Sequence, residues 1–403
     1  MTEERWPELK ELWNTLFKGV WPMWVAGLLL GFISVCLFLV KSPWGGTPSF
    51  VSWGQNLYQS LGVMETPGLK PVLENRYGLL GVMTVLGATS AALMGRQFCL
   101  RIAAPGELFK GLLGGILMGL GATLGLGCTI GGFISGWSAL SSGAIFLTIG
   151  LMVGTIAGFR YLLWEGDHLP IMRKGKRFEF LKVRNRKSPL QPVLGMLLFL
   201  GLLVGALFRY EALPVLTWFA VCGLLIGVIC QRSKFCVVRA FREPFLTGMS
   251  EAPIGVFAAL LVGIFGVTLI KYMGIGANSP EEARALALTG VYANFWLRGL
   301  IGGLIFGVGM VIAGGCAVGT LWRVGEGHVQ LWLAALGIML TAPLSKKFLV
   351  PKFAAALPEW GKLKVFLPDW VGYGGAVLVF LLIILAWYWF VTWNERTDKF
   401  TCM

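Results

Sequence analysis

The chain has 403 residues, of which 56% are hydrophobic and 13% charged, and its 34 Lys and Arg outnumber its 20 Asp and Glu. A mean hydropathy of +0.74 excludes a soluble globular domain, because such a chain would expose apolar surface to water. We therefore expect an all-α polytopic membrane protein.

Runs of apolar residues follow one another along almost the whole chain. A helix needs roughly 20 apolar residues to cross the hydrocarbon core, at about 1.5 Å per residue. About ten runs meet this length, and the first is expected to be a permanent span rather than a cleaved signal. The runs are 20–40, 76–95, 107–127, 138–163, 191–209, 213–231, 252–274, 297–315, 329–345 and 371–393.

Much of the net charge of +14 lies in the segment 173–187, which holds eight Lys or Arg and one acidic residue. The positive-inside rule explains such a segment as a cytoplasmic loop, so no nucleic-acid partner is expected. A role in docking a partner protein stays open.

An internal repeat relates the two parts of the chain. Residues 114–131, GGILMGLGATLGLGCTIG, and residues 302–319, GGLIFGVGMVIAGGCAVG, are identical at 7 of 18 positions at an offset of 188. Both segments end in Gly-Cys-x-x-Gly. Because glycine is abundant here, the coincident cysteines, Cys128 and Cys316, carry most of the weight of this alignment.

The same offset brings four spans near four others, with 191–209 answering 371–393, while 76–95 must slide about a dozen residues to meet 252–274, so that five spans answer five. An odd number of spans per half predicts an inverted 5+5 repeat, with short broken or re-entrant helices at the centre. We divide the chain into 1–189, which includes the basic loop, and 190–403. With that loop inside, both termini are expected to be cytoplasmic, although the five lysines of 346–370 then lie outside against the usual bias.

The glycines of the two repeated segments have two expected roles. Upstream glycines at i, i+4 spacing favour close packing of helices in lipid. The glycines around the two cysteines favour a broken helix, which is tolerated at membrane depth only where it is buried in protein or lines a cavity. They are Gly127, Gly131, Gly315 and Gly319. Cys128 and Cys316 are therefore predicted to approach each other at the midplane.

Two further cysteines, Cys99 in GRQFCLR and Cys236 in CQRSKFCVVRAFRE, each follow a phenylalanine among cations. Cations lower a thiol pKa or attract an anion, but they also mark ordinary cytoplasmic ends of spans. Cys222, Cys230 and Cys402 are expected to be small hydrophobic residues. With two histidines and no CxxC, HExxH or P-loop motif, the sequence predicts no metal site and no cofactor.

The strings RSKFC, GLGATLGLGC and GGCAVGTLWRVGEG resemble the YeeE/YedE family of bacterial sulfur-transport membrane proteins. The length, the order of the halves and the long cytoplasmic loop resemble its YedE branch. The resemblance implies a cytoplasmic-membrane transporter with cysteines along its path, here Cys236, Cys316 and Cys128. It also implies an association with small sulfur carriers of the TusA type. Thiosulfate is the cargo implied by the YeeE branch, and selenium metabolism is linked to the YedE branch.

We therefore expect uptake of a small sulfur anion, most simply thiosulfate, by thiols that donate weak hydrogen bonds. Thr129 and Thr320 would bind its oxygens, and Cys99 is a further candidate on the path. Arg323 and Glu326 either pair to fix the turn after Cys316, or Arg323 attracts the anion. A transporter of a selenium compound, a membrane thiol oxidoreductase and a docking subunit for a sulfur carrier are the alternatives.

Overall fold

The computed structural model describes residues 14–125, 127–168, 178–180, 190–291, 296–358, 365–397 and 399–400. In this part of the chain, ten helical segments are long and apolar enough to cross a membrane. They coincide with the ten apolar runs, so the expectation of an all-α polytopic membrane protein is confirmed. The basic loop 173–187, apart from 178–180, and Cys402 lie outside the described residues.

The elements of the first part of the chain lead up to the basic loop. They are η1 (Asn14–Lys18), α2 (Met23–Val40), α3 (Gly46–Ser60), α4 (Arg76–Met94), β1 (Leu100–Ile102), α5 (Pro105–Leu124), the π-helical η2 (Thr129–Ile134), α6 (Ser135–Ser138), α7 (Ser142–His168) and β2 (Phe178–Phe180). The strands β1 and β2 pair antiparallel, with Arg101 opposite Glu179.

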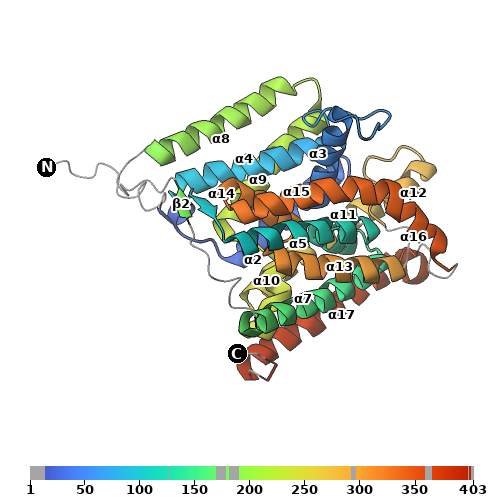
Figure 1. Cartoon of the computed structure of the whole chain (residues 1–403). Coiled ribbons are helices and arrows are strands. Elements are labelled where there is room, and N and C mark those ends of the chain that lie inside the picture. Colours follow the sequence, from blue (N-terminus) through green and yellow to red (C-terminus); the bar gives the residue numbers. More distant parts are fainter. Residues whose placement is uncertain are drawn as a thin grey trace.

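The elements after the basic loop are again nearly all helical. They are α8 (Leu190–Arg209), α9 (Pro214–Ser233), α10 (Val237–Leu246), α11 (Glu251–Met273), α12 (Pro280–Leu288), α13 (Leu297–Ala313), α14 (Ala317–Glu326), α15 (Val329–Leu344), η4 (Ser345–Leu349), α16 (Val350–Ala356) and α17 (Pro368–Thr397). The long helices lie side by side, with their axes roughly aligned (Figure 1).

The two repeated segments cross each other as α5 and α13. A Cβ on Gly114 would lie 2.6 Å from the carbonyl oxygen of Gly309, and one on Gly121 would lie 2.7 Å from that of Gly302. Residue numbers therefore rise along one helix as they fall along the other. An antiparallel crossing of equivalent helices is the arrangement of an inverted-topology repeat. Glycine allows backbone contact here, as expected for packing in lipid.

The remaining close helix pairs also occur in equivalent sets. The pair of α4 and α9 corresponds to that of α11 and α2, and the pair of α7 and α13 to that of α15 and α5. On the outside, α8 packs on α4 as α17 packs on α11. Equivalent helices of the two five-span repeats, with α8 counted in the first repeat, thus contact each other. The division at residues 189 and 190 stays a prediction.

Four short helices, which we call the half-helices, begin inside the bundle: α3, η2 with α6, α10 and α14. Three candidate spans each consist of a long helix and a half-helix, and they run from Pro105 to Ser138, from Pro214 to Leu246 and from Leu297 to Glu326. Each of these spans breaks at a cysteine, namely Cys128, Cys236 or Cys316.

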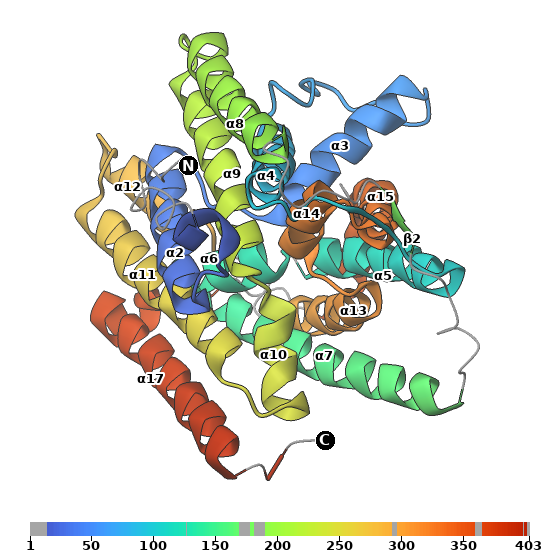
Figure 2. The same cartoon turned by 90° about the vertical axis from the view of Figure 1, so that its left-hand side faces the viewer.

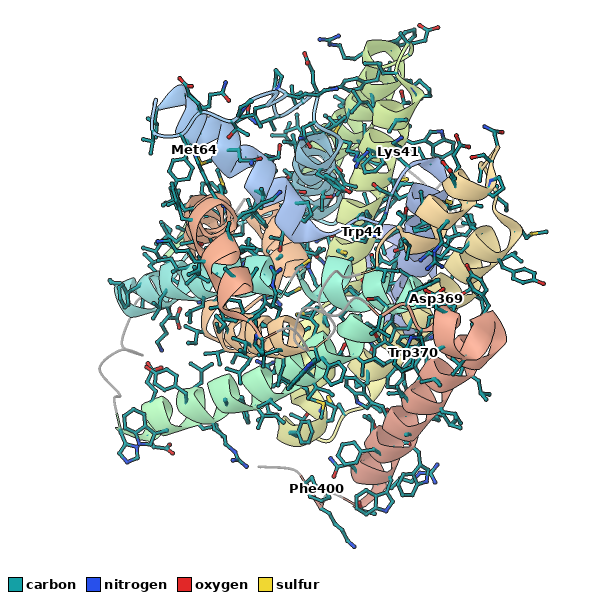
Figure 3. The ribbon with its side chains drawn as sticks, turned by 90° about the vertical axis from the view of Figure 1, so that its right-hand side faces the viewer. Lys41, Trp44, Met64, Asp369, Trp370 and Phe400 are labelled. Carbon is teal, nitrogen blue, oxygen red and sulfur yellow. The ribbon has the colours of Figure 1, made fainter. Side chains whose placement is uncertain are left out.

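We name the two ends of the molecule after a buried charged residue at each, Glu326 and Lys271. At the Glu326 end, β1 bridges to His328 and η1 lies against the end of α9, with Arg232 Nε donating to the carbonyl oxygen of Leu16 (3.2 Å). At the Lys271 end, Lys271 Nζ donates to the carbonyl oxygens of Ala139 (2.8 Å) and Ala287 (2.9 Å). Viewed along the spans, Trp44 lies near the middle of the bundle (Figure 3).

Candidate functional site

Cys128 and Cys316 cap the N-termini of two half-helices in the same way. Each has an extended backbone, and its Sγ accepts a hydrogen bond of 3.4 Å from the backbone N–H three residues on, at Gly131 and Gly319 respectively. The first N–H groups of a helix have no partner within it, and a capping side chain satisfies one of them. The motif Gly-Cys-x-x-Gly is therefore a thiol N-cap.

The glycines beside the Cys316 cap leave space next to this buried thiol. A Cβ on Gly319 would have only Cys316 Sγ within 4 Å, at 3.4 Å, and one on Gly315 would have no heavy atom nearer than 3.5 Å. The packing glycines differ, since a Cβ on Gly302 would lie 2.2 Å from the backbone nitrogen of Gly125. The two expected roles of glycine thus fall on different sets of residues.

Two more helix N-termini meet at the same place. Cys236 is the N-cap residue of α10, and Gly45 holds the equivalent position before α3. A Cβ on Gly45 would lie 2.9 Å from Gly131 Cα and 3.5 Å from Cys128 Sγ. A Cβ on Gly46 would lie 2.9 Å from the backbone nitrogen of Val318, in the first turn of α14. Helix N-termini carry partial positive charge, so this convergence favours an anion.

The half-helices of each half are joined by matching hydrogen bonds. Ser135 Oγ donates to the carbonyl oxygen of Trp44 (3.0 Å), directly before Gly45. Trp322 Nε1 donates to the carbonyl oxygen of Phe235 (3.2 Å), directly before Cys236. In both halves the second half-helix therefore fixes the residue that precedes the N-terminus of the first.

The structure gathers four buried thiols around these N-termini. Cys316 lies within electrostatic range of Cys128, Cys236 and Cys230. Cys230 was expected to be a small hydrophobic residue, yet its thiol faces this group from the last turn of α9. Its position six residues before Cys236 is the signal that the sequence offered. Cys99 instead lies at the Glu326 end, where its N–H donates to the carbonyl oxygen of Glu326 (3.4 Å).

Both predicted threonines carry buried hydroxyls: Thr320 Oγ1 has no hydrogen-bond partner among the described residues, and Thr129 Oγ1 lies within hydrogen-bonding reach of the Cys316 thiol. Thr129 directly follows Cys128 and lies near the Cys316 thiol, and Thr320 lies in the first turns of α14. On the long helices, Thr155 Oγ1 donates to the carbonyl oxygen of Leu151 (2.7 Å) and Thr84 Oγ1 to that of Leu80 (2.8 Å), whereas Thr268 Oγ1 of α11 is also without a partner among the described residues. Buried polar groups are seldom left unpaired, so these hydroxyls point to a polar ligand or water.

Glu326 does not pair with Arg323, which was one of the two arrangements expected from the sequence. Its buried carboxylate accepts hydrogen bonds from Lys234 Nζ and from Gln231 Nε2 (2.8 Å), and Arg101 and His328 lie within 4.0 Å. This cluster connects the end of α14 with the turn before Cys236 and with β1. Lys234, Gln231 and Arg101 were not predicted as parts of the site.

Arg323 has a structural contact at the break itself. Its Nη1 donates to the carbonyl oxygen of Gly314 (2.6 Å), at the C-terminus of α13, and its guanidinium lies 5.0 Å from the Trp322 ring centroid. Of the two expected roles, this contact favours fixing the turn, although the partner is a carbonyl and not Glu326. A cation at a helix C-terminus also complements the partial negative charge there.

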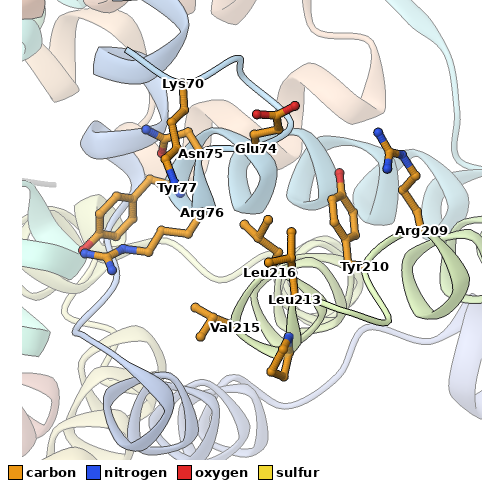
Figure 4. Close-up of a pocket in the computed structure, with 11 residues that line it drawn as sticks. Lys70, Glu74, Asn75, Arg76, Tyr77, Arg209, Tyr210, Leu213, Val215 and Leu216 are labelled. Carbon is orange, nitrogen blue, oxygen red and sulfur yellow. Dashed lines mark hydrogen bonds between the residues drawn. The ribbon is translucent and has the colours of Figure 1, made fainter. Parts of the chain in front are cut away.

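A basic pocket opens at the Lys271 end, between the start of α4 and the turn from α8 to α9 (Figure 4). It has a volume of about 560 Å³, and its lining includes Lys70, Arg76 and Arg209 beside the carboxylate of Glu74. Tyr77 also lines it, and its hydroxyl lies 3.0 Å from Ser42 Oγ and 3.3 Å from the carbonyl oxygen of Pro43. The pocket therefore adjoins the segment that leads to Gly45.

Metal chemistry finds no support in the part of the chain that the structure describes. No group of three or more His, Cys, Asp or Glu side chains there could hold a metal ion. The cysteines described are all free thiols.

Comparison with known proteins gives matches over nearly the whole chain. The family model described as "Sulphur transport" matches residues 2–157 and 232–401. Two proteins named "Probable transporter YedE" are similar over 97% of this chain and 96% of their own length, at 28% identity in Escherichia coli (strain K12) and 27% in Salmonella typhimurium. A protein named "Thiosulfate transporter TsuA", from Escherichia coli (strain K12), is 34% identical over 31% of this chain and 33% of its own length.

Proposed function

The chain belongs to the sulphur transport family and is a multi-pass transporter rather than an enzyme, and from that premise we propose that it carries thiosulfate between its cysteine-capped helix N-termini. The observation that carries this proposal is the convergence of four N-termini, three of them at cysteines, beside the buried hydroxyls of Thr129 and Thr320.

The chemistry of thiosulfate matches these groups. It is a dianion with oxygens that take strong hydrogen bonds and a soft terminal sulfur. Backbone N–H groups at helix N-termini and the hydroxyls of Thr129 and Thr320 would bind the oxygens, while protonated thiols would donate weak hydrogen bonds to the sulfur. The partial charges of the helix ends offset the dianion without a fixed cation that would trap it.

The path we propose runs from the basic pocket to the Glu326 end. Lys70, Arg76 and Arg209 would collect the anion, because a cleft of one charge raises the local concentration of the opposite ion. The anion would then pass Cys128, Cys316 and Cys236 in turn. Conduction needs sites that bind weakly enough to release the ion, and neutral thiols meet this condition.

Beyond Cys236 the anion would meet the cluster around Glu326. Lys234 there is neutralised by the carboxylate, and Lys234 Nζ lies 5.4 Å from the Trp322 ring centroid. We propose that Lys234 exchanges its bond to Glu326 for a transient contact with the anion, and that Cys99 lies on the exit from this cluster.

Selenium remains the second candidate cargo, because the relatives that match over almost the full length are named only as transporters, with no substrate. The matched thiosulfate transporter covers about a third of the chain. We also propose that the protein resides in the cytoplasmic membrane with both termini inside. A TusA-type carrier that docks on loop 173–187 stays a prediction.

Uptake by purified protein in liposomes distinguishes these cargoes. Radiolabelled thiosulfate, sulfate and selenite would be supplied separately at equal concentration to liposomes with and without the protein. We expect thiosulfate to accumulate well above the empty liposomes, and sulfate, which lacks the soft sulfur, to stay at their level. Accumulation of selenite alone would assign the selenium cargo, and accumulation of none of the three would contradict the proposal.

A further inference from the structure

The helices α7, α10 and α17 lie at the periphery of the bundle (Figure 2). Two adjoining cavities are lined by residues of these helices. One, of about 360 Å³, lies toward the Glu326 end and is lined by Arg160, Arg242 and Lys399 together with phenylalanines. The other, of about 490 Å³, lies nearer the middle of the spans. Phe245 lines both, so the two cavities adjoin at this side chain, and we call them together the groove.

The inner part of this groove is apolar and open to the lipid. Ile149 and Val153 of α7, which line it, are 46% and 48% exposed. Its few polar groups are satisfied by one another, since Trp137 Nε1 donates to Thr148 Oγ1 (2.9 Å), which donates to the carbonyl oxygen of Ala144 (2.8 Å). Such a surface suits an acyl chain.

The outer part of the groove brings together cations from three different elements. Arg160 comes from α7, Arg242 from α10, and Lys399 from just beyond α17. Among the described residues, none of the three forms an ion pair, and Arg242 Nε is buried without a hydrogen-bond partner. The adjacent carboxylate of Glu243 accepts from Arg239 Nε (2.6 Å) through one oxygen, and its other oxygen forms no hydrogen bond among the described residues. A phosphate group would supply the missing acceptor and charge.

The dimensions of the groove correspond to one leaflet. Along α7, Ile145 at the inner end and Arg160 at the outer end are separated by about 22 Å, at about 1.5 Å per residue. Half of a bilayer, headgroups included, is about 20–22 Å thick. Basic pockets between spans are recognised sites for anionic headgroups. We propose that this groove binds an anionic phospholipid of the leaflet at the Glu326 end, with its phosphate among the three cations.

The lipid would support the half-helices from outside. Phe241 of α10 lies 5.1 Å from the Trp387 ring of α17 and 5.5 Å from the Phe133 ring of η2, between ring centroids. Asn394 Nδ2 of α17 also donates to the carbonyl oxygen of Pro244 (2.6 Å). The wall of the groove is thus formed by the helix that begins at Cys236. This binding site is independent of the transported anion.

Native mass spectrometry of the full chain in detergent tests the site, with phosphatidylglycerol or phosphatidylcholine added as the probe. We expect phosphatidylglycerol adducts to persist at lipid concentrations where phosphatidylcholine adducts do not. A triple variant, Arg160→Gln with Arg242→Gln and Lys399→Gln, should bind phosphatidylglycerol on the order of a hundredfold more weakly, since each cation contributes about fivefold.

A matched triple variant at the other end, Lys346→Gln with Lys347→Gln and Lys352→Gln, removes the same charge and should keep the adducts. Ile149→Trp fills the apolar part without changing the charge, so it should also weaken them and covers the case in which the first triple variant fails to fold. Equal adducts in both triple variants, or no preference for phosphatidylglycerol, would overturn the proposal. No substrate is present, so the result does not depend on which anion is transported.

Discussion

At the scale of single residues, the cysteines could be predicted from the sequence because they recur at a fixed offset. What the pattern did not contain is their local role, since Cys128 and Cys316 are N-caps whose thiols accept from Gly131 and Gly319. The pairing of Glu326 with Lys234 was missed because it joins residues 92 positions apart, outside any local motif. Local spacing reveals caps and faces of helices, but it does not reveal tertiary ion pairs.

Removing the unpartnered hydroxyl of Thr320 should affect stability and uptake in opposite directions. In Thr320→Val the buried, unsatisfied oxygen is removed, so thermal stability should be unchanged or higher, because such a group costs about 1–3 kcal/mol. Thiosulfate uptake should fall about tenfold, the loss of one hydrogen bond of about 1.4 kcal/mol to the anion. Melting temperature in detergent and uptake into liposomes measure the two effects.

Thr155→Val is the matched control for this prediction. Its hydroxyl bonds to the carbonyl oxygen of Leu151, so the variant should lose about 1 kcal/mol of stability and keep its uptake. If Thr320→Val destabilised the protein and left uptake unchanged, Thr320 would have a structural role only.

At the scale of elements, the ten long runs were predictable from hydrophobicity and length alone. The half-helices α3 and α10 were not, because fifteen and ten residues are too few to cross the membrane and α10 carries three charged side chains. They are stable inside the bundle, where other helices cover them. Gly45 and Cys236 are separated by 191 positions, which is close to the repeat offset of 188. Extending the repeat beyond the glycine-rich segments would therefore have revealed these two half-helices.

The crossing of α5 and α13 requires glycine at Gly302. In Gly302→Ala the new Cβ would lie 2.2 Å from the backbone nitrogen of Gly125 and 2.4 Å from its Cα. Backbone cannot yield as a flexible side chain can, so we expect a loss of about 1–3 kcal/mol of stability or more, together with reduced uptake.

Gly205→Ala serves as the control, because a Cβ there would have no heavy atom within 4 Å. This variant should unfold at the wild-type temperature. Equal melting temperatures for the two variants in detergent would mean that α5 and α13 do not cross in close contact.

At the scale of the whole molecule, the inverted arrangement makes a path with two dissimilar ends. The Lys271 end carries the basic pocket, and the Glu326 end carries the ion-pair cluster and the strand pair that anchors β2 of the basic loop. The sequence predicted the inversion from an odd number of spans. It could not predict the basic pocket, because Arg209 comes from a segment far along the chain from Lys70 and Arg76.

The proposed orientation predicts which end is accessible from outside the cell. Glu65→Cys, at the Lys271 end, should react with a membrane-impermeant maleimide on intact cells. Arg396→Cys, at the Glu326 end, should react only after the membrane is permeabilised. Both positions are exposed, and the native cysteines described are largely buried. The reverse pattern would place the termini outside.

The proposed transport path requires above all that the anion passes the thiols of Cys128 and Cys316. Thiosulfate uptake into liposomes by Cys128→Ala and Cys316→Ala, beside Cys222→Ala as a buried cysteine within α9, tests it directly. We expect uptake by the first two variants to fall to the level of empty liposomes while both remain folded, and Cys222→Ala to transport like the wild type. Full uptake by folded Cys128→Ala and Cys316→Ala would contradict it.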